Sequence, residues 1–304
     1  MGVPTLGCEC PVCTSTDVHD RRLRPSVMVR WRDAQSSRSG KASEGREALR
    51  TAGPEAGATG CPEADATGCQ ETGAANEAGA AGVSDRRFDA ERVVVIDTGP
   101  DFREQALREK LTRVDAVFYT HSHADHILGL DDLRPLSFEV ARQGGTIPLY
   151  ASSETRGVLE RIYEYTFSPD ATYPNRARVR LEPLAERTDV RGVEFVRVPL
   201  MHGAMEIAGF RFGSAAYLTD VSDIPESSFA LLEGLDHLVV SALRYKPHPS
   251  HATVDQAIGW ARRIGAKQTW LTHIAHELGH EETNRALPDG VRLAYDGLSL
   301  DVRL

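Results

Sequence analysis

One six-residue segment, His121-Ser122-His123-Ala124-Asp125-His126, constrains the fold of this chain more than any other feature. It follows residues 114–119, an apolar stretch that is typical of a buried strand. Three imidazoles and a carboxylate on the loop that leaves a strand form a ligand set for borderline divalent cations such as Zn²⁺ and Mn²⁺. In an extended loop the first two histidines point to one side, and a turn then presents the Asp–His pair to a second ion. The segment predicts a metal site at the edge of a sheet.

Strands and helices alternate along most of the chain. Strands are expected at residues 26–31, 92–97, 114–119, 148–151, 193–198, 215–219, 237–243, 268–272, 291–294 and 298–302, and helices at 102–111, 155–165, 225–232 and 252–264. The run Val93-Val94-Val95-Ile96 is fully apolar and β-branched, which favours a buried strand. Alternating elements of this kind predict an α/β protein in which helices cover β-sheets.

Residues 34–86 have a different composition from the rest of the chain. Ala, Gly, Glu and Ser dominate this segment, and large aliphatic residues are nearly absent, with Leu49 and Val83 as exceptions. Residues 51–82 hold five acids and no Lys or Arg. Such a segment buries too little apolar surface to offset the entropy lost on ordering. We therefore expect a disordered acidic insertion within a single domain that spans residues 1–304. Cys61 and Cys69 lie in the insertion and are expected to be plain, non-ligating thiols.

The overall charge limits the classes of partner. The chain has 304 residues, of which 35 are Lys or Arg and 44 are Asp or Glu, so its formal net charge is −9. A protein that binds a nucleic-acid backbone usually carries the opposite sign. No stretch approaches the roughly 20 apolar residues needed to span a bilayer, and the first residues lack the basic flank and apolar core of a secretory signal. These features disfavour nucleic acid, membrane residence and export, and they predict a cytoplasmic enzyme.

The spacing His-x-His-x-Asp-His after a strand resembles the signature of the metallo-β-lactamase superfamily. Three later segments match that superfamily in order: Pro199-Leu200-Met201-His202-Gly203, Tyr217-Leu218-Thr219-Asp220 and Leu271-Thr272-His273. The resemblance implies an αββα sandwich, in which two β-sheets are flanked by helices. It also implies a dinuclear site of two divalent metal ions, Zn or Mn. In that site His121, His123 and His202 hold the first ion, Asp125, His126 and His273 hold the second, and Asp220 bridges both.

Three cysteines, Cys8, Cys10 and Cys13, lie within six residues near the start of the chain. In a reducing compartment this spacing favours metal binding, with three reduced thiols beside a surface histidine as the alternative. A tetrahedral zinc needs a fourth ligand, and His276 lies three residues after His273. The combination of Cys-x-Cys-x-x-Cys with His-x-x-His resembles the PhnP-type phosphodiesterases, which open phosphoribosyl 1,2-cyclic phosphate. That resemblance implies a structural zinc held by Cys8, Cys10, Cys13 and His276.

The segment Pro247-His248-Pro249-Ser250-His251-Ala252-Thr253 resembles the family's loop that carries a histidine outside the metal ligands. We expect His251, at the start of the helix at residues 252–264, to contact a phosphate and to protonate the leaving oxygen, with His248 as the alternative. Asp125 is expected to orient the attacking water. Arg22 and Arg24 are expected on the solvated surface, with a phosphate contact as the alternative.

Together these residues predict a phosphodiesterase that hydrolyses a small cyclic phosphate ester by attack of a hydroxide shared between two metal ions. Two alternatives use the same core. One is RNA processing of the ribonuclease Z type, which the acidic insertion disfavours, and the other is a non-hydrolytic role similar to that of the pyrroloquinoline quinone biosynthesis B protein. A thioester hydrolase is a further alternative. The family resemblance also implies a homodimer. It further implies a first strand upstream of Gly2, because Met1 stands directly before Gly2-Val3-Pro4.

Overall fold

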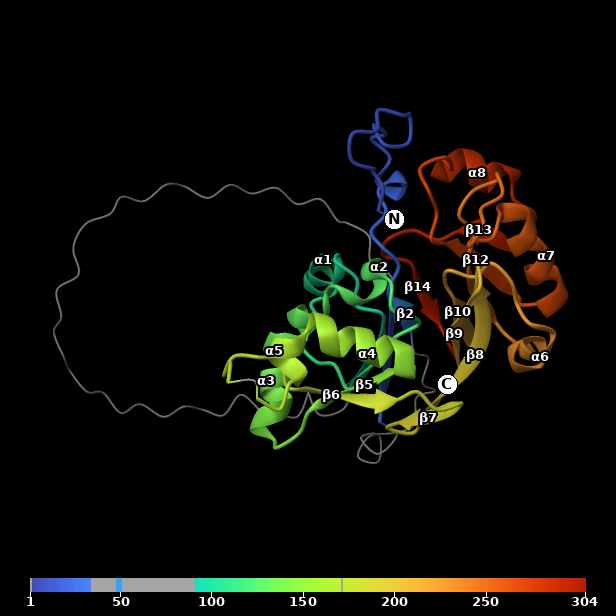
Figure 1. Cartoon of the computed structure of the whole chain (residues 1–304). Helices are drawn as coiled ribbons and strands as arrows, with labels where there is room; N and C mark the ends of the chain where they lie inside the picture. The colour runs from blue at the N-terminus through green and yellow to red at the C-terminus, as the bar shows by residue number, and fades with distance from the viewer. Residues whose placement is uncertain (1, 34–47, 51–90, 171) are drawn as a thin grey trace, which may run out of the picture.

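Two β-sheets pack face to face at the centre of the fold, and helices cover the outer face of each (Figure 1). The computed structural model describes residues 2–33, 48–50, 91–170 and 172–304. In Figure 1 the green helices α1–α5 lie on one side of the sheets and the orange-to-red helices α6–α8 lie on the other. The order of layers is helix, sheet, sheet, helix, which confirms the predicted α/β sandwich.

The first sheet has five strands in the order β1-β3-β4-β5-β6. Strand β1 pairs antiparallel with β3, and the remaining pairs are parallel. Because parallel strands are covered on both faces, they read as nearly continuous apolar runs, as the buried Val93–Ile96 stretch of β3 shows. The bounds are β1 Val27–Arg32, β3 Glu91–Ile96, β4 Ala116–Phe118, β5 Ile147–Ala151 and β6 Val179–Pro183.

The second sheet has seven strands in the order β13-β12-β11-β10-β9-β8-β7. Strands β10 to β13 run parallel, whereas β7, β8 and β9 form an antiparallel meander that joins β10. The bounds are β7 Arg187–Val190, β8 Val193–His202, β9 Met205–Phe212, β10 Ala215–Leu218, β11 His237–Ser241, β12 Gln268–Thr272 and β13 Val291–Leu293.

Eight α-helices and three 3-10 helices occur in the described residues. The bounds are α1 Phe102–Arg108, α2 Ala124–Ile127, α3 Arg134–Arg142, α4 Ser153–Ile162, α5 Glu164–Phe167, α6 Glu226–Phe229, α7 Val254–Ile264 and α8 His280–Ala286, with 3-10 helices at Val18–Asp20, Leu130–Leu133 and Ala230–Leu232. Helix α7 begins with a capping box, in which Thr253 and Gln256 satisfy each other's backbone N–H groups, and ends at Gly265 with φ 71°. None of the helices in the described ranges is both long and apolar enough to cross a bilayer.

Aromatic side chains join the two sheets in the central core. The ring of Phe118 on β4 stacks on Phe195 of β8 and on Tyr150 of β5, with centroids 4.9 Å apart in both cases. Separate apolar clusters lie between each sheet and its helices. The sandwich is therefore held by three packed layers of side chains.

The predicted insertion at residues 34–86 is described only at Ala48–Arg50, which forms strand β2 and pairs antiparallel with β14, Ser299–Asp301. These three residues include Leu49, one of the few aliphatic residues of the insertion. The rest of the predicted insertion lies outside the described residues, so the expectation of disorder stays a prediction. The predicted thiols Cys61 and Cys69 lie outside the described residues.

Candidate metal centre

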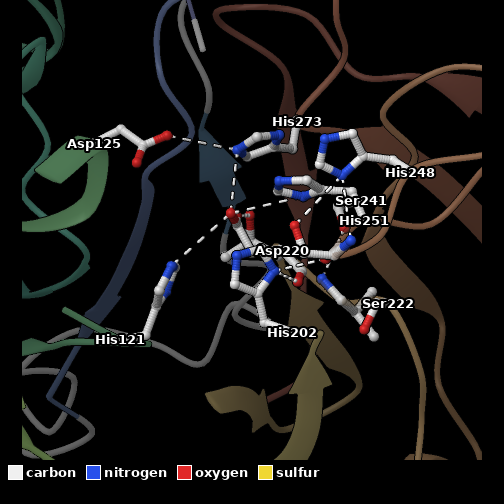
Figure 2. A network of polar contacts seen from close by, with 12 residues as sticks. His121, Asp125, His202, Asp220, Ser222, Ser241, His248, His251 and His273 are labelled. Carbon is white, nitrogen blue, oxygen red and sulfur yellow. Dashed lines mark hydrogen bonds and ion pairs between the residues drawn. The ribbon is translucent and has the colours of Figure 1, made fainter. Parts of the chain in front are cut away.

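The predicted ligands gather at one edge of the two sheets, where the strands end (Figure 2). One half of them comes from the first sheet, where His121 and His123 lie on the loop after β4 and Asp125 and His126 belong to α2. The other half comes from the second sheet. His202 ends β8, Asp220 and His273 follow β10 and β12, and His251 precedes α7. Residues that are distant in the sequence thus converge on one point.

Asp220 lies at the centre of this convergence. Its Oδ1 is 3.2 Å from His126 Nε2. Its Oδ2 is 3.3 Å from His273 Nε2 and 4.0 Å from His121 Nε2. His273 Nε2 is in turn 3.7 Å from Asp125 Oδ2. A carboxylate between two sets of imidazoles is an arrangement that can bridge two cations.

The donor atoms fall into groups in which all atoms lie within 4.8 Å of one another. One group is His121, His123 and His202, a second is Asp125, His126 and His273, and a third joins Asp220 to His121 and His126. These are the sets that the resemblance implies for the two ions. A further group joins His202 and Asp220 to His251.

The chemistry of the donors fits divalent metal ions. Among the described residues, the Nε2 atoms of His121, His126 and His273 are buried and have no hydrogen-bond partner with good geometry. Such unpaired buried atoms are costly unless something else satisfies them. Imidazole and carboxylate are ligands for Zn²⁺ and Mn²⁺ alike, so the donor set fits either metal.

Neighbouring groups orient two of the histidines. His202 donates from Nδ1 to the carbonyl oxygens of Asp220 and Ser250, at 2.7 and 2.6 Å. His126 donates from Nδ1 to Asp97 Oδ2, at 2.7 Å. A hydrogen on Nδ1 leaves the Nε2 lone pair free for a metal, and such partners typically fix the tautomer of a ligating histidine. Both histidines therefore present the atom that a cation needs.

Asp97 contacts a candidate ligand of the centre, and the sequence analysis did not identify it. It is fully buried after β3, and its carboxylate also accepts hydrogen bonds from the backbone N–H and the hydroxyl of Thr120, both at 2.8 Å. The available signal was an acid directly after the apolar run Val93–Ile96. A lone acid at a strand end is more often a cap, so the pattern alone did not distinguish it.

Three residues of the centre have left-handed backbones. The φ angles are 64° at Asp97, 56° at Asp220 and 53° at His273. A residue with a Cβ adopts this conformation at a cost of roughly 1–2 kcal/mol. Each of them follows a buried strand, so the chain turns sharply at the edge of its sheet. Strain gathered on three strand ends is typical of a functional site.

Helix α2, which carries Asp125, packs closely against the backbone of Gly99. A Cβ on Gly99 would lie 2.1 Å from the carbonyl oxygen of Asp125, so only glycine allows this approach. Two backbone hydrogen bonds hold the same contact: Thr98 N donates to the His126 carbonyl and Gly129 N to the Thr98 carbonyl, at 2.9 and 2.7 Å. The loop after β3 thus fixes the position of α2.

Burial and neighbouring charges shift the pKa values of the groups in the centre. Burial opposes ionisation of Asp220, but His273 and His126 outweigh it and hold the pKa of the Asp220 carboxyl well below its ordinary value. Burial and the charge of His126 lower the pKa of His121 well below its ordinary value. Burial would also lower the pKa of His126, but Asp220 and Asp97 raise it well above its ordinary value. Asp220 is therefore ionised and His121 neutral, the forms that ligate cations, whereas His126 carries a second ring proton that a cation displaces on binding.

His251 lies beside the predicted ligands. Its ring is 4.8 Å from that of His273, centroid to centroid, and its Nδ1 is 3.9 Å from Asp220 Oδ2. Burial and the neighbouring His273 lower the pKa of His251 to about 3. The ring of the alternative residue, His248, is 4.9 Å from that of His251, and His248 belongs to none of the donor groups that the described residues form around Asp220.

A second cluster brings together the three cysteines and His276. The Nδ1 atom of His276 lies 3.1, 3.6 and 3.5 Å from the sulfurs of Cys8, Cys10 and Cys13. Cys13 donates its backbone N–H to the sulfur of Cys10, which lowers the pKa of that thiol to about 7. Four S and N donors within 4.8 Å fit a tetrahedral zinc.

The expectation for Arg22 is wrong. Its side chain is buried, and it donates to the carbonyl oxygens of Ala275 and Leu278. The contacts span more than 250 positions of sequence, so no local pattern indicated them. Arg24 is partly exposed and pairs with Asp101 at 2.8 Å.

Comparison with known proteins places the chain in a family. A family model described as a beta-lactamase superfamily domain matches residues 92–274. Together with the layered fold and the His/Asp centre, this match shows that the chain belongs to the metallo-β-lactamase superfamily. That fold implies divalent metal ions, with which the His/Asp groups are compatible.

Within the superfamily this is a PhnP-like protein. The chain is 43% identical to a solved structure described as a new diphosphatase from the PhnP family, with a TM-score of 0.75 and coverage of 100% of this chain and 94% of that one. Both parts of the predicted resemblance are confirmed. The superfamily and this likeness support a metal-dependent hydrolase.

Two further matches are more distant. An octanoyltransferase of Porphyromonas gingivalis is 29% identical over 98% of this chain, but the chain spans only 48% of that protein. The short form of human tRNase Z is 21% identical, with a TM-score of 0.53 and coverage of 70% of this chain and 89% of that one. This second likeness shows the shared fold alone.

Proposed function

We propose that this protein is a phosphodiesterase that opens a small cyclic phosphate ester of the phosphoribosyl 1,2-cyclic phosphate kind. The observation that carries the proposal is the convergence of six His and Asp residues around the Asp220 carboxylate, at distances suited to two cations. The 43% identity to a PhnP-family diphosphatase supports hydrolysis at phosphorus.

In this proposal His121, His123 and His202 hold one divalent ion, Zn or Mn, and Asp125, His126 and His273 hold the other. Asp220 reaches both. When bound, two such ions activate water and neutralise the charge that develops on phosphoryl oxygens. The cluster of Cys8, Cys10, Cys13 and His276 holds a structural zinc, because four protein ligands leave no position for water.

The protein's own groups orient the reaction. Asp97 and the carbonyls of Asp220 and Ser250 fix the tautomers of His126 and His202. The exposed His123 and the partly exposed Asp125 mark the open side of the centre, from which a ligand approaches. Asp125 accepts a hydrogen bond from the incoming water and so directs it toward phosphorus.

His251 contacts the phosphoryl group. Because its imidazole is neutral at pH 7, it meets the ester as a hydrogen-bond donor through the ring nitrogen that carries hydrogen. A hydrogen bond to the leaving oxygen favours the charge that grows there as the ester bond breaks. In this proposal His251 acts as a neutral hydrogen-bond donor to the leaving oxygen, and not as the positively charged imidazolium that would protonate it.

A diphosphate ester is the second candidate substrate. The specific observation in its favour is that the PhnP-family structure 43% identical to this chain is described as a diphosphatase. The two substrates place the scissile bond differently, at a ribose oxygen or at a bridging phosphate oxygen, and the products therefore distinguish them.

The test is a hydrolysis assay with Zn²⁺ or Mn²⁺ on a cyclic ribose phosphate, a cyclic nucleotide, an aryl phosphodiester, a diphosphate ester and a thioester. We expect turnover of the phosphodiesters and its loss in His123→Ala and Asp220→Ala. His237→Ala serves as the control, because His237 lies at the start of β11 and away from the centre. Circular dichroism checks that each variant folds. Full activity in Asp220→Ala, or turnover of the thioester alone, would refute the proposal.

A further inference from the structure

The turn between β12 and α8 carries residues of both metal clusters. His273 belongs to the centre around Asp220, and His276, three residues later, faces the cysteine sulfurs. The backbone of His273 is left-handed, with φ 53°. A turn that carries strain at one ligand needs bonds elsewhere to hold its shape.

A buried ion pair supplies those bonds. Arg22 donates from Nη1 to the Ala275 carbonyl at 3.1 Å and from Nη2 to the Leu278 carbonyl at 2.6 Å. Asp20 lies 3.3 Å from Arg22 Nη2, and its Oδ1 accepts the backbone N–H of His280 at 2.8 Å. Arg22 and Asp20 are 6% and 7% exposed, so these bonds are little weakened by solvent.

The same arginine is tied to the segment that leads to the cysteines. The backbone of Arg22 exchanges two hydrogen bonds with Val3, at 2.8 and 2.9 Å. Thr5 then donates its backbone N–H to the sulfur of Cys13 at 3.3 Å. Arg22 lies after the three cysteines in the chain and bonds to Val3, which lies before them. It therefore links the segment that holds the cysteine cluster to the turn that carries His273.

We propose that Arg22, aligned by Asp20, is a positioning residue that sets the place of His273 and thereby the metal affinity of the centre around Asp220. It acts through the backbone of the turn and touches no predicted ligand side chain of that centre. This inference rests on the proposed metal binding of both clusters. Partners that orient metal ligands typically change metal affinity by about 10- to 100-fold when they are removed.

The test compares metal affinity in Arg22→Met, Arg22→Lys and a matched control, Arg211→Met. Arg211 also donates to backbone carbonyls, those of Gly213 and Leu231, but in a part of the second sheet away from the turn. Co²⁺ titration followed by absorption separates the clusters, because only the cysteine cluster gives sulfur-to-metal charge-transfer bands. Competition with a chelator gives the affinity of each, and thermal unfolding gives the stability of each variant.

We expect Arg22→Met to weaken binding at the His/Asp centre by at least about tenfold, as for other orienting partners. Arg22→Lys should fall between Arg22→Met and the wild type, because one ammonium cannot span both carbonyls as the guanidinium does. Arg211→Met should lower the unfolding temperature and leave the affinity unchanged.

Equal affinities in Arg22→Met and the wild type would overturn the inference, as would an equal loss in Arg22→Met and Arg211→Met. Failure of the wild-type protein to bind Co²⁺ at its His/Asp centre would instead overturn the proposed function. The two failures are therefore distinguishable.

Discussion

The role of Asp97 leads to the sharpest prediction, which concerns the replacement Asp97→Asn. This change keeps the shape of the side chain and one oxygen, which still accepts the backbone N–H of Thr120 as Oδ1 does now. The new NH₂ group stands where Oδ2 accepts from His126 Nδ1 at 2.7 Å. Two donors then face each other. In the neutral, metal-binding form of His126, the contact is restored only when the ring hydrogen lies on Nε2 instead of Nδ1.

That tautomer removes the lone pair with which His126 would bind a metal. Its Nε2–H would instead point at Asp220 Oδ1, now 3.2 Å away. Loss of an orienting partner weakens metal binding by about 10- to 100-fold, which is about 1.4–2.7 kcal/mol. Loss of one hydrogen bond to a charged group lowers the free energy of unfolding by about 1.5–3 kcal/mol.

The assay is chelator competition with Zn²⁺ or Mn²⁺, combined with denaturant unfolding of the metal-free protein. Asp115→Asn is the matched control, since Asp115 is also a buried carboxylate of the first sheet, which accepts the backbone N–H of Val93 and pairs with Arg113. The control should lose stability and keep its metal affinity. If Asp97→Asn binds both ions as tightly as the wild type, the tautomer argument fails.

Two further predictions concern the cysteine cluster and the contact between Gly99 and helix α2. Cys10→Ser should lower the zinc content and the unfolding temperature more than it lowers hydrolysis, because Cys10 belongs to the cluster with His276 and not to the centre around Asp220. Elemental analysis measures the zinc content and calorimetry measures the unfolding temperature. An unchanged zinc content would contradict the prediction. Gly99→Ala should lower the free energy of unfolding by about 1–3 kcal/mol, because its Cβ would overlap the Asp125 carbonyl oxygen. Denaturant titration checks this second change, and a stability equal to the wild type would mean that the loop yields freely.

The strands and the positions of the candidate ligands at strand ends were predictable from the sequence because both depend on local pattern. A buried strand must be apolar, so β3 and β11 appear as apolar runs, and His121, Asp220 and His273 lie within three residues of strand ends. That these side chains lie close together in the folded protein then follows from one rule, that the ends of neighbouring parallel strands meet at the same edge of a sheet.

Elements and contacts that depend on tertiary structure were not predictable in the same way. The helix expected at residues 102–111 ends at Arg108, because Lys110 turns the chain with φ 50° and Leu111 N bonds back to the Ala106 carbonyl. No glycine marks that turn in the sequence. Strands β6, β7 and β9 and helices α2, α3 and α8 were also not expected. The burial of Arg22 depends on carbonyls far along the chain, where residue type carries no signal.

The origin of the donors from two sheets has a consequence for the integrity of the molecule. His121, His123, Asp125 and His126 come from one half of the sandwich, and His202, Asp220 and His273 come from the other. Any ion shared through Asp220 would act as a cross-link across the seam between the halves. Neither half, expressed by itself, would supply all the ligands of the centre. Metal binding would therefore show whether the two halves have assembled.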